Sequence, residues 1–341
     1  MTGPAIDPTW WDAEPGWLNT ASYGLPPRAA AEQLLAVIDD WRHGRTSWRP
    51  WDAATGRARA AFAALIGAPV ADVCVSSTAS QIISTVATAL PPSARVLVPD
   101  IEFTSNVFPW AVAAHVEVAP PDRLADALTS RHAAVAFSLV QSATGRLAPL
   151  ADILAAARAC DALVVADASQ ACGWLPVDVT TGIDALACAA YKWLMAPRGA
   201  AFGYLSPRLR ERMRPLAANW YAGADRDSSD YGMPLRLAGD ARAFDLSPAW
   251  FSFVGAAPAL ELVNRIGVPA IHDHDVGLAN RLRAGLGLAP GRSAIVTLEE
   301  ADPERLRAAG VRFAVRAGKV RLSFHAYTTA ADVDRALEAL R

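Results

Sequence analysis

The sequence predicts an α/β protein with a mostly parallel sheet, followed by a smaller α+β unit toward the C-terminus. From about residue 56 to 205, short apolar runs alternate with longer alanine-rich segments of helical spacing. This alternation is typical of a parallel sheet with helices on both faces, where ligands bind at the carboxyl ends of the strands. From residue 248 onward, two helical segments precede three short apolar runs and a closing helix.

The expected elements follow from these apolar runs. The strands of the large sheet are predicted at 72–76, 95–98, 115–118, 133–139, 163–166, 185–189 and 201–205. In the small unit, helices are expected after Pro248, near 273–286 and from Thr329, and strands at 294–298, 311–315 and 320–324. The predicted domains are an N-terminal arm over 1–20, a large domain over 21–240 and a small domain over 241–341.

Composition limits the classes of function. The chain has 341 residues, 52% hydrophobic content and a formal net charge of −2, which fits a globular protein with a large core. It has no apolar stretch long enough to cross a membrane, and its N-terminus lacks a signal-peptide pattern, so a cytoplasmic location is expected. Without a block of Lys or Arg, neither nucleic acid nor a membrane surface is the expected partner. The four cysteines have no metal-ligand spacing, so no metal site is predicted.

A lysine and an aspartate carry the strongest chemical signal. Lys192 is one of only two lysines, and it lies among apolar neighbours that bury its stem, which lowers an amine pKa. Asp167 ends the apolar run 163–166. Pyridoxal phosphate (PLP) enzymes need a lysine that forms an imine and an anion that keeps the pyridine nitrogen protonated, and this pair predicts that cofactor. Taken singly, the lysine also fits a surface position, and the aspartate a helix cap or a magnesium ligand.

Other residues provide the remaining parts of a cofactor site. Ser77, Thr78 and Ala79 lie in a hydroxyl-rich turn between a strand and a helix, where backbone N–H groups can bind a phosphate, although an ordinary N-cap fits equally. Phe103 follows another strand and can lie against the cofactor ring or simply fill the core. Gln170 lies one turn after the aspartate and can donate a hydrogen bond to the phenolic oxygen of the ring.

A substrate-binding residue is predicted near the C-terminus. Arg321 lies on the apolar run 320–324, and its planar guanidinium suits the α-carboxylate of an amino acid or a structural ion pair. The long segment rich in Gly, Asp and Ser at 223–232 is expected to be a loop that covers the site, with aspartates that either meet a cationic substrate or stay in solvent.

The order of these motifs resembles the class V aminotransferase family of fold type I PLP enzymes, which includes cysteine desulfurases, kynureninase-like hydrolases, isopenicillin N epimerase-like proteins and ergothioneine-pathway C–S lyases. The resemblance covers nearly the whole chain. The matching segments are similar to the family's substrate loop (18–26), phosphate turn (76–80), ring-stacking segment (102–110), pyridine partners (167–170), Schiff-base segment (191–199) and carboxylate-binding strand (320–329).

This resemblance implies further site residues. Asn19 and Ser22 of the substrate loop are expected to contact substrate, and Ser142 to lie near the cofactor. Tyr191 is expected to bind the phosphate with its hydroxyl group. The resemblance also implies a homodimer with the active sites at the subunit interface. Trp220 and Ser247 are expected to be site residues there, and Ser247 is expected to reach the phosphate bound by the neighbouring subunit.

Departures from the family pattern favour one reaction. Family desulfurases carry a mobile cysteine in the C-terminal part of the chain, whereas the last cysteine here is Cys188. Many relatives stack a histidine on the ring where this chain has Phe103. We therefore predict C–S bond cleavage by β-elimination on a small cysteine-derived amino acid. Transamination is the alternative, followed by epimerisation. A non-catalytic binding module is a further alternative, whereas a nucleotide-binding protein is disfavoured because no glycine-rich phosphate motif is present.

Overall fold

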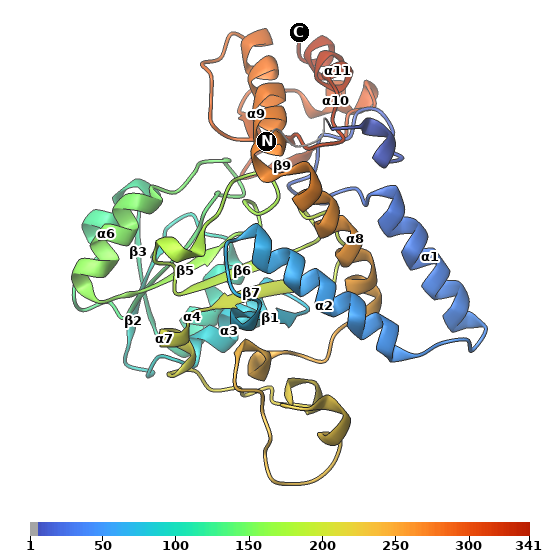
Figure 1. Ribbon diagram of the computed structural model, residues 1–341. Helices are drawn as coiled ribbons and strands as arrows, with labels where there is room; N and C mark the ends of the chain where they lie inside the picture. Colours follow the sequence, from blue (N-terminus) through green and yellow to red (C-terminus); the bar gives the residue numbers. More distant parts are fainter. Residues whose placement is uncertain (1–5) are drawn as a thin grey trace.

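The computed structural model describes residues 6–341 and contains a large α/β unit with a smaller sheet-and-helix unit at one end (Figure 1). The large sheet has the strand order β1-β7-β6-β5-β4-β2-β3, in which β7 runs antiparallel to both of its neighbours. All other neighbouring strands are parallel. The strands are β1 (Val73–Ser76), β2 (Arg95–Pro99), β3 (His115–Ala119), β4 (Ala134–Ser138), β5 (Leu163–Asp167), β6 (Ala185–Ala189) and β7 (Ala201–Leu205). The fold class predicted from the sequence is confirmed.

Helices cover both faces of this sheet. Successive residues of one strand belong to opposite cores: Val164 and Ala166 pack in one, Leu163 and Val165 in the other. This explains why the strands are continuously apolar rather than alternating. The helices of this part of the chain are α1 (Arg28–Arg42), α2 (Trp48–Leu65), α3 (Ala79–Ala87), α4 (Phe108–Ala113), α5 (Leu124–Ala127), α6 (Leu150–Cys160), α7 (Pro207–Arg210) and α8 (Trp250–Ile266).

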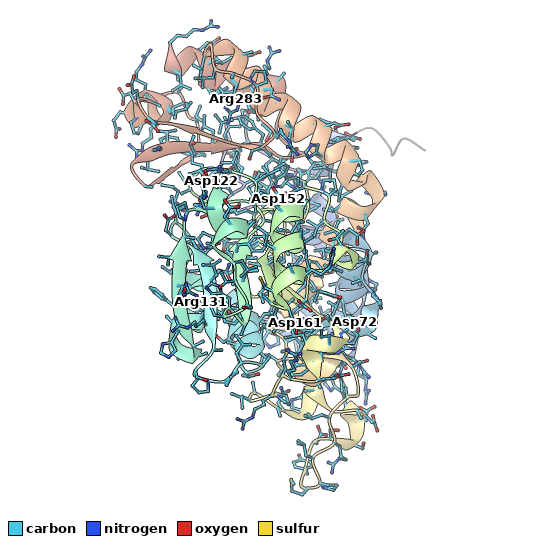
Figure 2. The ribbon with its side chains drawn as sticks, turned by 90° about the vertical axis from the view of Figure 1, so that its left-hand side faces the viewer. Asp72, Asp122, Arg131, Asp152, Asp161 and Arg283 are labelled. Carbon is cyan, nitrogen blue, oxygen red and sulfur yellow. The ribbon has the colours of Figure 1, made fainter. Side chains whose placement is uncertain are left out.

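The small unit is an antiparallel sheet of order β8-β10-β9 covered by helices, and Figure 2 shows it at the end of the large sheet. Its elements are α9 (Val268–Gly285), β8 (Ile295–Leu298), α10 (Pro303–Ala308), β9 (Ala314–Arg316), β10 (Lys319–Ser323) and α11 (Ala330–Leu340). The strand expected at 311–315 was predicted too early. Arg312 instead forms a parallel bridge with Trp17, so the N-terminal segment pairs with the chain just before β9.

The boundaries between the parts are not sharp. Leu18 packs in the core of the small unit, whereas α8 packs against α1 and α2 of the large one. The predicted division at residues 20 and 240 stays a prediction, and residues 1–5 of the predicted arm lie outside the described residues. Among residues 6–341, no helix is long and apolar enough to span a membrane.

Candidate active site

One cavity lies where several strands of the large sheet end. Because β7 is antiparallel to both β1 and β6, the strands β1, β5 and β6 point the same way, and their carboxyl ends meet at one edge. The residues that follow these strands, together with Phe103 after β2, line the cavity. The lining consists of Ser77, Thr78, Ala79, Ser80, Phe103, Ser105, Asp167, Ser169, Ala189, Tyr191, Lys192 and Arg198. Topology thus brings together most of the residues predicted for the cofactor.

Lys192 follows β6 in a tight turn. Its carbonyl accepts a hydrogen bond from Met195 N at 3.0 Å, and Met195 has a positive φ of 55°. The amine Nζ lies 5.8 Å from the ring centroid of Phe103 and has no ion pair or hydrogen bond among residues 6–341. Burial lowers the pKa of this amine, the charge of Asp167 opposes that shift, and the charge of Arg321 adds to it. The lysine is therefore held toward its neutral, nucleophilic form.

Asp167 is buried at the end of β5. One of its carboxylate oxygens accepts a hydrogen bond from Ser169 N at 2.7 Å, which fixes the side chain at the cavity wall. Ser169 Oγ in turn accepts from Ala189 N at 3.0 Å, which ties the ends of β5 and β6 together. No cationic side chain among the described residues forms an ion pair with Asp167. A buried carboxylate without a protein partner suits a cationic group of a ligand, such as a protonated pyridine nitrogen.

The turn before α3 lies at one end of the cavity and can bind an anion. Thr78 caps α3, and its Oγ accepts a hydrogen bond from Gln81 N at 3.2 Å. The first N–H groups of a helix have no partner within the helix, so those of Ala79 and its neighbours are available to an anion. The sequence reasoning missed Arg198, whose guanidinium lies 4.9 Å from the Tyr191 ring centroid and forms no ion pair with the described residues. Its place within the segment 191–199 was the available signal.

Glu102 also escaped the sequence reasoning, although it positions Phe103. Its carboxylate accepts hydrogen bonds from Phe103 N at 2.7 Å, and from Ser138 N and Ser138 Oγ at 2.6 Å each. Burial raises the pKa of Glu102, and the hydrogen bonds from Ser138 oppose that shift. Phe103 remains half exposed, at 50%, so the aromatic face is open to a ligand while its backbone is held against β4.

Gln170 lies outside the lining of the cavity. Its Nε2 donates to Ala21 O at 2.9 Å, and its Oε1 accepts from Trp193 Nε1 at 2.7 Å. The side chain thus connects the N-terminal loop with the lysine segment, and it does not line the cavity. One amide proton remains for a ligand, so its contact with the phenolic oxygen of a cofactor stays a prediction.

The predicted substrate residues meet at the neighbouring small sheet. Arg321 donates from Nη1 to Ser142 O at 2.6 Å and from Nη2 to Ser22 Oγ at 2.8 Å. Ser142 therefore contributes its backbone carbonyl to the arginine. Asn19 pairs with Ser323 through a parallel bridge, and its buried Oδ1 has no hydrogen-bond partner among the described residues. Burial, reinforced by the charge of Arg316, lowers the pKa of Arg321 to about 10.

Comparison with known proteins identifies the family. The sequence pattern of the family "Aminotransferase class-V" matches residues 49–314, which is more than half of the chain. The chain belongs to the class V aminotransferase family. An uncharacterized aminotransferase of Bacillus subtilis is 26% identical, with 92% of this chain and 91% of that protein covered. Isopenicillin N epimerase of Streptomyces clavuligerus is also 26% identical, with 95% and 93% covered.

Solved structures show the same fold. A cystine C–S lyase in complex with cysteine persulfide matches with a TM-score of 0.86 and 19% identity, covering 96% of this chain and 97% of the other. The cysteine desulfurase CsdA of Escherichia coli matches with a TM-score of 0.82 and 20% identity, covering 98% of each chain. This class V family member therefore has the fold type I architecture that its sequence predicted, and it is a PLP-dependent enzyme.

The side chains of this class V protein fit that cofactor. One cavity is lined by an amine and a buried carboxylate that form no ion pair within residues 6–341, and by a helix start with a nearby guanidinium. Each of these matches a separate group of PLP. Lys192 would hold its carbonyl carbon, Asp167 its ring nitrogen, and Ser77, Thr78 and Arg198 its phosphate.

Besides Ser142 and Gln170, two more residues predicted for the cofactor site do not line the cavity. Trp220 lies in an aromatic cluster, with ring centroids 5.7 Å from Trp48 and 6.4 Å from Trp250. Ser247 is exposed and lies outside the lining. The loop 223–232 contributes no residue to the lining of the cavity in its own chain. It protrudes on the side opposite α9 (Figure 1). Its Asp227 pairs with Arg49 at 3.0 Å and is exposed, which agrees with the alternative that these aspartates stay in solvent.

Proposed function

We propose that this enzyme cleaves the C–S bond of a cysteine-derived amino acid by β-elimination. The observation that carries the proposal is a site with a free basic amine but no accessible thiol. Cys188 is fully buried beside the site, and burial raises the pKa of its thiol well above the usual range. Cys74 and Cys172 are also buried, and Cys160 is half-buried at the end of α6. No cysteine therefore lies at the surface of the cavity to accept sulfur as a persulfide.

PLP supplies an electron sink that stabilises negative charge at the α-carbon of a bound amino acid. The residues of this chain supply the rest. Arg321 binds the α-carboxylate through its planar fork, and Phe103 shields the reacting atoms from water. Lys192 would take the α-proton, the electron pair of the Cα–H bond would form a Cα–Cβ double bond, and the Cβ–S bond would break with its electron pair leaving on sulfur. Asp167 would stabilise positive charge on the ring nitrogen.

Lys192 is the expected carrier of the α-proton because Phe103 and Tyr191 are poorly suited to accept it. Phe103 has no titratable proton, and burial raises the pKa of the Tyr191 hydroxyl. The lowered pKa of Lys192 places a neutral amine beside the α-carbon at a less alkaline pH than usual. The relative named as an aminotransferase keeps transamination as the second candidate, because both reactions begin with the same proton transfer.

The proposal includes a homodimer. Phe108, Val112 and Leu216 expose 63%, 90% and 70% of their surface around a depression that shares Ser80 and Ser105 with the cofactor cavity. Apolar exposure of this kind marks an interface, and a second copy placed here would lie beside the active site. The expected contribution of Ser247 and Trp220 to the neighbouring site belongs to this proposal, and the cytoplasmic location stays a prediction.

The test is incubation of the PLP-loaded protein with cysteine, cystine and S-substituted cysteines. Release of pyruvate and ammonia together with a thiol or persulfide is the expected result, with the Lys192→Ala variant lacking both the visible absorption band and turnover. Conversion of the cofactor to its pyridoxamine form without pyruvate would instead establish transamination. A lysine variant that keeps full turnover would refute the assigned role.

A further inference from the structure

The hairpin of β9 and β10 places two arginines on one face of the small sheet. Ala317 and Gly318 connect the strands, both with positive φ (47° and 78°), as in the tight turns that fix hairpin register. Arg316 lies opposite Lys319, and Arg321 lies opposite Ala314. Directly opposed residues project to the same side, and so do residues two apart along a strand. Arg316 and Arg321 are therefore diagonal neighbours on one face.

A third cation on this face, Lys319, has a carboxylate partner, whereas the two arginines have none among the described residues. Lys319 forms an ion pair with Glu299. Within residues 6–341, neither arginine pairs with a carboxylate. They flank one hydroxyl instead, with Ser22 Oγ 2.8 Å from Arg321 Nη2 and 3.4 Å from Arg316 Nη2. Like charges at neighbouring sheet positions repel each other, so the arrangement is unfavourable unless anions bind there.

The two guanidinium groups differ in burial. Arg321 is buried, and its Nη1 and Nη2 donate to Ser142 O and Ser22 Oγ, which fixes its fork in the inner part of the site. Arg316 is exposed at the end of β9, and its Nη1 contacts only Val315 O. Both positive charges also lower the pKa of Lys192, after the larger effect of burial, so they lie within electrostatic reach of the reacting amine.

We propose that Arg316 binds a second anionic group, so that the preferred substrate is an amino acid with an acidic side-chain substituent. The inference rests on the proposed function, in which Arg321 holds the α-carboxylate. Since one carboxylate occupies the buried fork, the exposed guanidinium is left for a carboxylate or sulfonate further along the same substrate. Ser22 lies between the two groups and keeps the arginines apart, which matches two anions rather than one.

The test compares two ligands of equal size, S-carboxymethyl-L-cysteine and its neutral amide, S-carbamidomethyl-L-cysteine. Their dissociation constants are measured on the PLP-loaded protein by the change in visible absorbance and, independently, by calorimetry. The acid is expected to bind on the order of tenfold more tightly than the amide, as one charge-assisted hydrogen bond implies. Arg316→Gln should remove this preference without changing the affinity for the amide by more than about twofold, and Arg316→Lys should restore part of it. Arg292→Gln, an exposed arginine outside the site, is the matched control.

The possible results distinguish a failure of the second anion site from a failure of the proposed C–S bond cleavage. Equal affinities in the unmodified protein would overturn the second anion site. A loss of affinity for acid and amide alike in Arg316→Gln would also overturn it, because both arginines would then hold one carboxylate. Absence of pyruvate from either ligand contradicts the proposed function, whereas calorimetry still decides the charge preference.

Discussion

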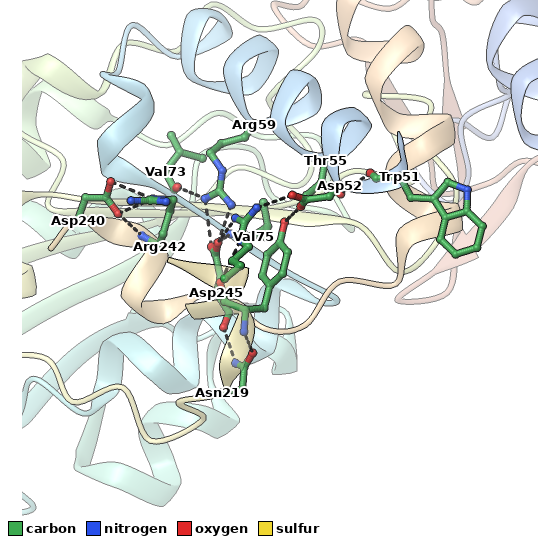
Figure 3. A network of polar contacts seen from close by, with 12 residues as sticks. Trp51, Asp52, Thr55, Arg59, Val73, Val75, Asn219, Asp240, Arg242 and Asp245 are labelled. Carbon is green, nitrogen blue, oxygen red and sulfur yellow. Dashed lines mark hydrogen bonds and ion pairs between the residues drawn. The ribbon is translucent and has the colours of Figure 1, made fainter. Parts of the chain in front are cut away.

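Replacing Asp245 with asparagine is expected to destabilise the protein by about 3–5 kcal/mol, because it leaves a buried guanidinium without its counter-charge. Arg59 on α2 and Asp245 form a bidentate pair, with Nη2–Oδ2 at 2.6 Å and Nη1–Oδ1 at 3.1 Å (Figure 3). Their side chains are only 5% and 0% exposed. Burial alone would lower the pKa of Arg59, but the charge and hydrogen bonds of Asp245 raise it by more, so the guanidinium is charged in the unmodified protein.

The same pair holds the strand that leads to the phosphate turn. Arg59 Nη1 donates to Val73 O at 2.5 Å, and Asp245 Oδ1 accepts from Val75 N at 2.8 Å, so two residues of β1 are tied to one ion pair. Arg226 adds a more distant contact, with Nη2 4.0 Å from Asp245 Oδ2. Loss of the carboxylate charge is therefore expected to weaken PLP binding as well as stability.

The measurement is urea unfolding followed by circular dichroism, with and without PLP. The matched control is Glu261→Gln. It breaks the ion pair between Glu261 on α8 and Arg57, which lies on α2 like Arg59; the two groups are 3.0 Å apart, and both side chains are 47% exposed. That exposed pair is expected to contribute no more than about 1 kcal/mol. A double variant, Arg59→Met with Asp245→Leu, should recover most of the lost stability because it buries no charge. A loss in Asp245→Asn no larger than that of the control would refute the reasoning.

Three further predictions concern the site itself. Arg198→Gln should raise the dissociation constant for PLP about tenfold, measured by fluorescence titration of the apoprotein, and an unchanged constant would remove this arginine from the phosphate site. Arg321→Gln removes a positive charge that lowers the Lys192 pKa, so the pH at which the apoprotein begins to combine rapidly with PLP should move upward; a shift toward lower pH would contradict the assigned sign. Gly24→Ala should lower thermal stability and activity together, since an added Cβ would lie 1.9 Å from Lys192 O, and a variant as stable as the parent would show that the loop can move aside.

The sequence predicted those strands and helices whose formation depends mainly on residues close by in the chain. The strand over 185–189 was predicted with its observed bounds, and the helix from Thr329 begins with the capping box formed by that residue and Asp332. Lys192 and Asp167 were predicted for the same reason, because each lies at or just after the end of an apolar run that indicates a buried strand. The strand expected at 311–315 failed because its first residues pair with the N-terminal segment, a contact between distant parts of the chain.

What the sequence by itself determined is the succession of buried strands and the chemical groups at their ends, since apolar periodicity and a rare lysine are visible without any neighbour. Only the tertiary structure decided which of those groups share a space. Arg198 lines the same cavity as the turn before α3, and Gln170 forms hydrogen bonds with Ala21 and Trp193. Arg316 and Arg321 both donate to the Ser22 hydroxyl. The physical reason is that strand order and hairpin register fix these distances, and both arise from packing between segments that lie far apart in the chain.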